Sequence, residues 1–327
     1  MSRGLGDVYK RQTLQPPVQM MVISYNKSYD VLQTFTDDQR EIYNALREVK
    51  MRTGGRTETD NARKDILRQF SDSQRNSQQD VGSMNRAHGM MIGFAEEEAN
   101  DLQFTLGALR DTVTMLSGLP GKKVIVYASN GLPMIAGLDL FYAYANTYHE
   151  SSAITESARY NMNRHFNSLV SNANAQDISF YTFGVGGLEN PTLSSAELGT
   201  AQDSMSASIG MQNYLDPLRF MADSTGGACT VNTNDFTAGL EKVGQDFFTY
   251  YSLGYTLHQS GLDKVHRIKV ELPNHPDYRV RYRQRFVEKS LESRVQDKVV
   301  TGLMFPLDDN PMQIMIEIGS QGPAGET

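Results

Sequence analysis

The sequence predicts an α/β fold, in which helices cover both faces of a mainly parallel, doubly wound sheet. The first observation is the segment 122–133, KKVIVYASNGLP, where five apolar residues stand between two lysines and a Gly/Pro-containing turn. Such an unbroken apolar run is typical of a central parallel strand covered on both faces. The second is that strand-like and helix-like patterns alternate along the middle of the chain. The third is a period-two pattern after Tyr250, which predicts an antiparallel β extension at a sheet edge.

A hairpin and two helices are predicted at the start of the chain. Residues 18–25 and 29–35 have the composition of strands joined by a short turn. The tetrad Thr36-Asp37-Asp38-Gln39 is a capping box with Thr36 at the N-cap, and it predicts a helix that ends at Gly54-Gly55. A second helix follows the loop 54–60, with apolar positions at Ala62, Ile66, Leu67 and Phe70.

A polar stretch precedes a long helix. Residues 71–93 are rich in Ser, Gln and Asn, and we interpret them as a mobile insertion or a frayed helix extension. Charged residues 96–98 then open a helix that Gly118 and Pro120 end. Its apolar residues recur at steps of four and three, which places them on one face. They are Leu102, Leu106, Leu109, Val113 and Leu116.

The same alternation continues to residue 247, and the pattern then changes. Further helices are predicted within 152–175, 214–225 and 235–247, with strands at 178–185 and 228–232. Period-two strands follow at 251–257, 266–272 and 278–282. We interpret 288–302 as a connector and 303–327 as the start of a truncated β domain.

Composition excludes several classes of function. The chain has 327 residues, a net charge of −7 and a single cysteine, Cys229. This acidic balance gives no reason to expect nucleic acid as a partner. One cysteine excludes an internal disulfide framework and a cysteine-based zinc site. No run of 18 apolar residues is present, so we expect no membrane span.

Residues 1–12, MSRGLGDVYKRQ, resemble translated sequencing-adapter read-through. We therefore expect the protein proper to begin near Thr13, with a signal peptide and a first strand lost upstream. The alternative is a genuine disordered tail. On the first interpretation the intact protein is secreted or belongs to the cell envelope.

Three segments together resemble one family. They are 116–133 (LSGLPGKKVIVYASNGLP), 247–257 (FFTYYSLGYTL) and 266–286 (HRIKVELPNHPDYRVRYRQRF). With the hairpin and helix at 18–50, they make residues 13–287 similar to the von Willebrand factor A-related domains of bacterial, often exported, proteins. The resemblance implies a Rossmann-like sheet that lacks its first strand, and a protein-binding or adhesion function.

The same resemblance implies a degenerate metal site. Domains of this family commonly hold Mg²⁺ with an Asp-x-Ser-x-Ser loop, a Thr from a second loop and an Asp from a third. Here the Asp-x-Ser-x-Ser loop is absent, and Ser129 and Asn130 stand where the third-loop Asp belongs. Thr57 is the best match for the Thr, with Thr59 in reserve. We expect no cofactor in this chain, because Mg²⁺ prefers carboxylates, whereas an intact upstream loop would restore a Mg²⁺ site. The alternative is that Thr57 and Asn130 cap loop and helix ends.

Two further features could bind partners. The loop 131–150 is apolar and aromatic and directly follows the strand predicted at 122–128. It is either a lid packed on the domain or an exposed contact surface for a protein ligand or a neighbouring domain. Its candidate contact residues are Leu132, Met134, Phe141, Tyr142 and Tyr144. Arginines at 279, 281, 283 and 285 form a row that is either a solvated edge face or a site for an anionic partner.

The sequence thus favours a non-enzymatic protein-protein interaction or adhesion module, with a binding face built from the loops 53–60, 129–150 and 186–210. Two alternatives stay open, an α/β enzyme acting on a small molecule and a purely structural domain of a larger envelope protein. The six histidines lack metal-ligand spacing and no Gly-x-Ser-x-Gly motif is present, which disfavours a hydrolase.

Overall fold

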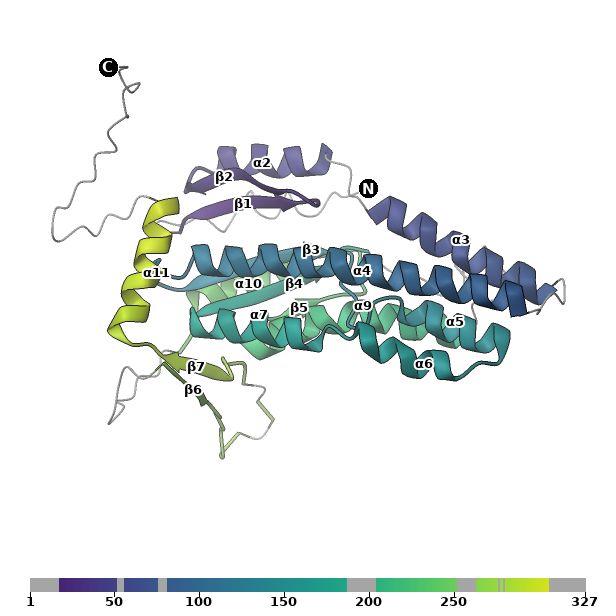
Figure 1. Ribbon diagram of the computed structural model, residues 1–327. Helices are drawn as coiled ribbons and strands as arrows, with labels where there is room; N and C mark the ends of the chain where they lie inside the picture. The colour runs from purple at the N-terminus through teal and green to yellow at the C-terminus, as the bar shows by residue number, and fades with distance from the viewer. Residues whose placement is uncertain are drawn as a thin grey trace, which may run out of the picture.

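The computed structural model describes residues 18–51, 56–75, 81–186, 204–251, 263–275, 277–278 and 280–305. Within these ranges the α/β class is confirmed. A parallel sheet has the strand order β3-β4-β5, formed by β3 (Lys123–Ser129), β4 (Ile178–Gly184) and β5 (Cys229–Thr230). Figure 1 shows helices packed around this sheet. They are α4 (Val81–Met115), α7 (Asn163–Ala175), α9 (Ser204–Thr225) and α10 (Thr237–Phe248).

The two faces of the sheet carry different cores because successive strand residues point to opposite sides. Ile178 and Phe180 of β4 join the larger core, which α4, α7 and α9 cover. Tyr181 and Phe183 join a smaller core with α10. The sheet is therefore covered by helices on both faces, as the alternating pattern predicts.

The expectation that the strand at 122–128 is central is wrong in the part of the chain that the structure describes. There β3 pairs only with β4, and β4 is the central strand. All residues of β4 except Ser179 are buried, whereas Val126 of β3 is 37% exposed. An apolar run indicates low polarity on both faces, but it does not tell whether the strand has one neighbour or two.

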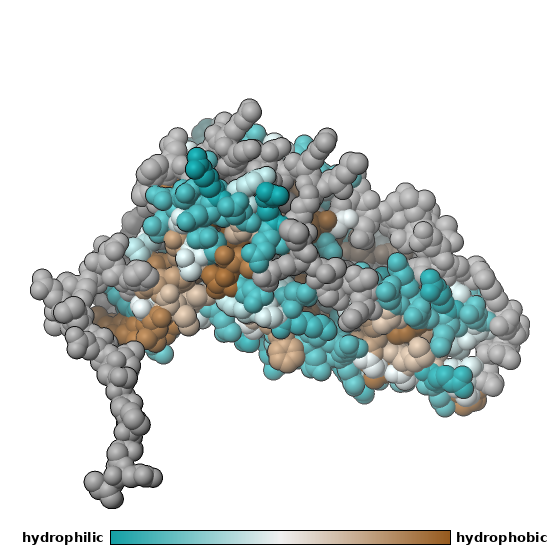
Figure 2. All heavy atoms as spheres, turned by 90° about the horizontal axis from the view of Figure 1, so that it is seen from above, coloured by the Kyte–Doolittle hydropathy of each residue, from teal (hydrophilic) through white to brown (hydrophobic). Residues whose placement is uncertain are grey.

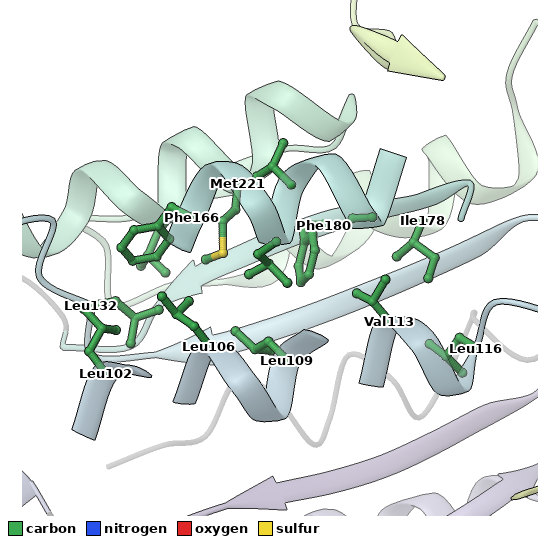
Figure 3. Packing of buried hydrophobic residues seen from close by; sticks show 14 of the residues in the cluster. Leu102, Leu106, Leu109, Val113, Leu116, Leu132, Phe166, Ile178, Phe180 and Met221 are labelled. Carbon is green, nitrogen blue, oxygen red and sulfur yellow. The ribbon is translucent and has the colours of Figure 1, made fainter. Parts of the chain in front are cut away.

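The leucine stripe of the long helix is confirmed. Figure 3 shows it facing Phe166 of α7, Phe180 of β4 and Met221 of α9. The helix itself is longer than predicted, since α4 has 35 residues and spans about 52 Å at 1.5 Å per residue. Leu116 is buried directly after its last residue.

The first half of α4 builds a second core beyond the carboxyl ends of the strands (Figure 1). We call the elements around it the helical extension: α3 (Arg56–Arg75), residues 81–97 of α4, α5 (Leu138–Tyr148), α6 (Ser152–Glu156) and the 3-10 helix η1 (Ser157–Tyr160). Its buried residues include Ile66, Leu67, Phe70, Ala87, Met91, Phe94, Leu140, Phe141, Tyr144 and Tyr148.

Residues 71–93 are helical where the structure describes them, so the mobile-insertion alternative is wrong there and the helix-extension alternative fits better. Residues 71–75 complete α3, and 81–93 form the first turns of α4. Ala87 and Met91 lie four apart and are buried, so a helical stripe exists there. Small and polar neighbours hide it in the sequence.

The N-terminal hairpin is confirmed. β1 (Met20–Tyr25) pairs antiparallel with β2 (Tyr29–Thr36), and α2 (Gln39–Met51) follows. The cap differs from the prediction by two residues. The carboxylate of Asp38 accepts the N–H of Arg40 at 2.7 Å, while Thr36 Oγ1 accepts the N–H of Asp38 at 3.1 Å. Asp38 thus caps the helix, and Thr36 orders the turn before it.

Near the C-terminus, β6 (Lys264–Arg267) and β7 (Arg285–Glu288) form an antiparallel pair. In the described ranges this pair is separate from the parallel sheet, so the predicted edge addition is wrong there. Tyr251 and the described residues among 278–282 are not in strands, and 252–257 lie outside the described residues.

Three arginines of the predicted row make internal contacts, and Arg279 lies outside the described residues. Arg281 forms an ion pair with Asp246 of α10 at 2.6 Å, and Arg283 pairs with Asp177 at 3.0 Å. Arg285 donates to Ser171 Oγ of α7 at 3.3 Å. These contacts attach residues 281–285 to α10, to α7 and to the turn that follows α7. Neither a solvated edge nor an anionic partner is needed to explain them.

The expected connector 288–302 instead contains a helix, α11 (Leu291–Met304), packed against the end of α4. Ser290 caps it by accepting the N–H of Ser293 at 3.2 Å. Thr301 Oγ1 donates to the carbonyl of Met115 at 3.0 Å and accepts the N–H of Gly118 at 2.8 Å. Residues 306–327 lie outside the described part. No helix in the described ranges is long and apolar enough to span a membrane.

Gly118 gives the clearest test of this packing. A Cβ there would lie 2.7 Å from the carbonyl oxygen of Asp297 and 2.7 Å from the Cα of Lys298. We predict that Gly118→Ala lowers the free energy of unfolding by about 1–3 kcal/mol, because the backbone of α11 must shift. Urea denaturation measures this value.

The matched control is Gly107→Ala within α4, where a Cβ meets nothing within 4 Å. We expect it to stabilise by up to about 1 kcal/mol through helix propensity. Equal effects of the two substitutions would contradict the described docking of α11.

Candidate functional site

The carboxyl ends of parallel strands are where ligands bind in open α/β sheets. At the end of β3, Ser129 Oγ accepts the N–H of Gly131 at 3.2 Å, and Asn130 is exposed. Gly131 has φ +119° and sits against Tyr214 of α9, where a Cβ would approach to 2.9 Å. The turn after β3 is therefore closed by α9, and Ser129 orders it.

The predicted metal ligands do not fit Mg²⁺. Thr57 lies in the first turn of α3 and not in a loop, because that helix begins at Arg56. With Ser129 and Asn130 it offers only neutral oxygens, whereas Mg²⁺ is normally bound through at least one carboxylate. In the described ranges, no cluster of three or more His, Cys, Asp or Glu side chains could hold a metal ion. The role of these residues as ligands stays a prediction, with no chemistry derived from it.

The structure instead brings together a buried acid–arginine cluster next to this turn. We define it as Arg63 of α3, Glu98 of α4, Asp139 of α5 and Tyr214 of α9. Arg63 Nε donates to Asp139 Oδ2 at 2.6 Å. The carboxylate of Glu98 accepts the N–H of Gly137 at 2.7 Å and the hydroxyl of Tyr214. Four helices thus meet through side chains that are far apart in the sequence.

A glycine lets the loop approach α4 closely enough for this contact. Gly137 precedes α5 with φ +67°, and a Cβ there would lie 3.0 Å from the Cβ of Ala95. A side chain at this position would be strained by the backbone and would collide with α4. The N–H of Gly137 can therefore reach Glu98.

Burial dominates the electrostatics of the cluster. It raises the pKa of Glu98 to about 7, although the hydrogen bonds from Tyr214 and Gly137 act in the opposite direction. Burial likewise raises the pKa of Tyr214 well above its usual value. The neighbouring Asp139 raises the pKa of Arg63, so this guanidinium stays charged.

The two carboxylates of the cluster are buried, since Glu98 is 7% exposed and Asp139 is 1% exposed. The side chain of Arg63 is 24% exposed, and Tyr214 is half-buried. A carboxyl group that titrates near neutral pH could act as a general base only if a substrate reached it. In this arrangement the four side chains join the helical extension to the sheet, and they occupy the place where an α/β enzyme would hold its ligand.

Of the two alternatives for the aromatic loop 131–150, the structure favours a lid packed on the domain. Leu132, Phe141 and Tyr144 are buried, so the expectation that they form an exposed contact surface is wrong. Met134 and Tyr142 are half-buried. Tyr144 packs edge-on against the ring of Phe70, with centroids 5.9 Å apart. The residues from Leu138 onward form α5, and its apolar face closes the second core.

The sequence pattern does not predict this cluster. It predicts that Glu98, together with Glu96 and Glu97, forms the charged first turn of a helix. A signal was present, because Glu98, Leu102 and Leu106 lie four residues apart and share the buried face. Its partners Arg63, Asp139 and Tyr214 carry no such pattern.

No family model, no curated protein and no solved structure matches this chain. The resemblance to von Willebrand factor A-related domains therefore rests on the segments 116–133, 247–257 and 266–286 together with the hairpin and helix at 18–50.

Glu98 predicts an unusual dependence of stability on pH. A carboxyl whose pKa is raised on folding binds its proton more tightly in the folded state, so its contribution to stability falls as pH rises from 4.5 to about 7. Glu98→Gln mimics the neutral acid and removes this loss. We predict that the free energy of unfolding of the variant, relative to that of the wild type, rises by up to about 3 kcal/mol between pH 4.5 and 8. Urea denaturation across that range measures it.

Glu97→Gln, at an exposed neighbouring position, is the control and should follow the wild type. If the difference between Glu98→Gln and wild type did not vary with pH, Glu98 would not be a buried acid of raised pKa.

The ion pair of the cluster gives a second prediction. Asp139→Asn leaves the guanidinium of Arg63 without its partner carboxylate inside the protein, and we expect a loss of about 3–5 kcal/mol. Thermal and urea unfolding measure the loss.

The exposed pair Arg68–Asp65 on α3 supplies the matched comparison, with Asp65 68% exposed. Asp65→Asn should cost less than about 1 kcal/mol, because water screens this pair. Similar losses in both variants would argue against a buried ion pair at Arg63.

Proposed function

We propose that this chain is a non-enzymatic protein-binding domain whose contact surface is the outer face of α11. The observation that carries this proposal is an apolar ridge, defined as Leu291, Val295, Val299 and Leu303. Their exposed fractions are 78%, 53%, 57% and 79%. They recur every four residues and so form a continuous row along the helix. Figure 2 shows hydrophobic residues at the surface toward the end of the molecule where Figure 1 places α11.

The opposite face of α11 is held firmly. Thr301 is buried and bonds to both Met115 and Gly118. Asp297 pairs with Lys289 and accepts from Gln176 Nε2 at 3.4 Å. The next residue after the helix, Phe305, is buried, and its ring lies 5.1 Å from that of Phe35 in β2. The ridge is thus displayed on a fixed element, which reduces the entropy that a partner must offset on binding.

Exposed apolar rows of this kind suit helix-in-groove recognition, in which side chains at i and i+4 anchor the contact. Full burial of each side chain contributes about 1.5–3 kcal/mol. Single exposed apolar residues are common on proteins, but an ordered row on one helix favours an interaction surface.

The class of protein is the one predicted from the sequence, a non-enzymatic protein-binding domain, but the proposed contact surface is α11 and not the loops. The segment 129–150 buries Phe141, Tyr144 and Tyr148 in the second core, whereas α11 presents its apolar side chains outward. An adhesion role and export of the intact protein, to the cell exterior or envelope, remain part of the proposal on the strength of the family resemblance.

One observation favours the alternative, an enzyme acting on a small molecule. Glu98 lies near the carboxyl end of β3 with a pKa raised to about 7, as a general base requires. Its burial beneath α5 and α9 speaks for a structural role instead.

A photoreactive amino acid in place of Val299 tests the proposal in cells that produce the protein. We expect irradiation to attach a defined protein partner at this position, since the ridge is the contact surface. The matched control is Phe104 of α4, an apolar residue 71% exposed outside the ridge. It should give no adduct.

Equal labelling from both positions, or no protein adduct from Val299, would contradict the proposal. Turnover in a substrate screen that Glu98→Gln abolishes would favour the enzyme instead.

A further inference from the structure

We propose that the partner of the apolar ridge is a second copy of this chain, paired through α11 in antiparallel orientation. This inference rests on the proposed function and names its partner. The four ridge residues have the order Leu-Val-Val-Leu, which is the same in both directions.

A two-fold axis requires such self-complementarity, because residue i of one copy contacts residue j of the other, and j contacts i. With the axis at the middle of the ridge, Leu291 meets the second copy's Leu303. Val295 likewise meets the second copy's Val299. Large residues pair with large residues at the ends, and smaller ones pair at the centre. The two rows can then interdigitate as ridges at four-residue spacing do.

Charge favours the antiparallel orientation over the parallel one. The exposed charged residues of α11 are Glu292, Arg294 and Lys298. In the antiparallel register they fall opposite the neutral residues Gly302, Val300 and Gln296. In a parallel pair each charged residue would lie beside its own copy, which places like charges together at a cost.

The size of the ridge sets the strength of the pair. A stable interface buries about 800 Å² on each partner and involves some 20–30 residues. One face of a 14-residue helix supplies less than this. We therefore expect weak, concentration-dependent dimers, with a Kd of roughly micromolar or higher.

Disulfide trapping tests the register directly. Val295→Cys and Val299→Cys are made separately in full-length chains that carry Cys229→Ala, which removes the native thiol. Two cysteines join only when their Cα atoms lie within about 7 Å. We expect a mixture of the two variants to form intermolecular disulfides roughly tenfold faster than either variant alone. Leu291→Cys mixed with Leu303→Cys should behave in the same way.

Faster trapping within one variant than in the mixture would indicate parallel pairing and overturn the inference. An absence of intermolecular disulfides in every mixture would also overturn it. The occupant of the ridge would then be another protein or residues 306–327 of the same chain. If the photoreactive Val299 chain still captured a different protein, the proposed function would stand and only its self-pairing would fail.

Sedimentation analysis of the unmodified chain provides an independent measurement. The weight-average mass should rise with concentration, and Val299→Glu should raise the dimer Kd by about tenfold or more, because a charge is then buried at the centre of the contact. Phe104→Glu should leave it unchanged. A mass that stays monomeric at all concentrations would overturn the inference.

Discussion

The packing of α4 is the constraint on which the other elements depend. Its second half turns Leu102, Leu106 and Leu109 toward the sheet, while its first half turns Ala87, Met91 and Phe94 toward the helical extension. Glu98 lies between these two apolar stretches. It accepts hydrogen bonds from the N–H of Gly137, in the loop before α5, and from the hydroxyl of Tyr214 in α9. The last residues of α4 and the turn after it hold α11. One helix therefore contacts the sheet core, the second core and the inner face of the helix that carries the proposed contact surface.

Much of this architecture could be predicted, because local patterns decide it. The hairpin, the leucine stripe and each strand or helix of the alternating pattern depend on residues that lie close together in the sequence. The same locality explains two errors. The segment 122–128 is apolar enough for a central strand, yet the neighbours of β3 depend on distant chain segments. Residues 81–93 are helical because Ala87 and Met91 meet α3 and α5, and their polar neighbours conceal that contact.

The candidate site was harder to predict for the same reason. Arg63 and Asp139 are 76 positions apart, and Glu98 and Tyr214 are 116 apart. Nothing in their immediate surroundings distinguishes them from surface residues, except the alignment of Glu98 with the leucine stripe. The aromatic loop illustrates the converse problem. Its apolar composition is equally compatible with a lid and with a contact surface, and only the position of the second core decides between them.

We predict that α4 makes the two cores a single cooperative unit, joined at Glu98. Native-state hydrogen exchange of the α4 amides tests this claim most directly, because it measures the free energy of opening at each residue. The buried amides around Met91 and those around Leu106 should exchange with the same free energy and respond equally to low concentrations of denaturant. If the amides around Met91 opened at a clearly lower free energy, the helical extension would unfold by itself, and the central claim would be contradicted.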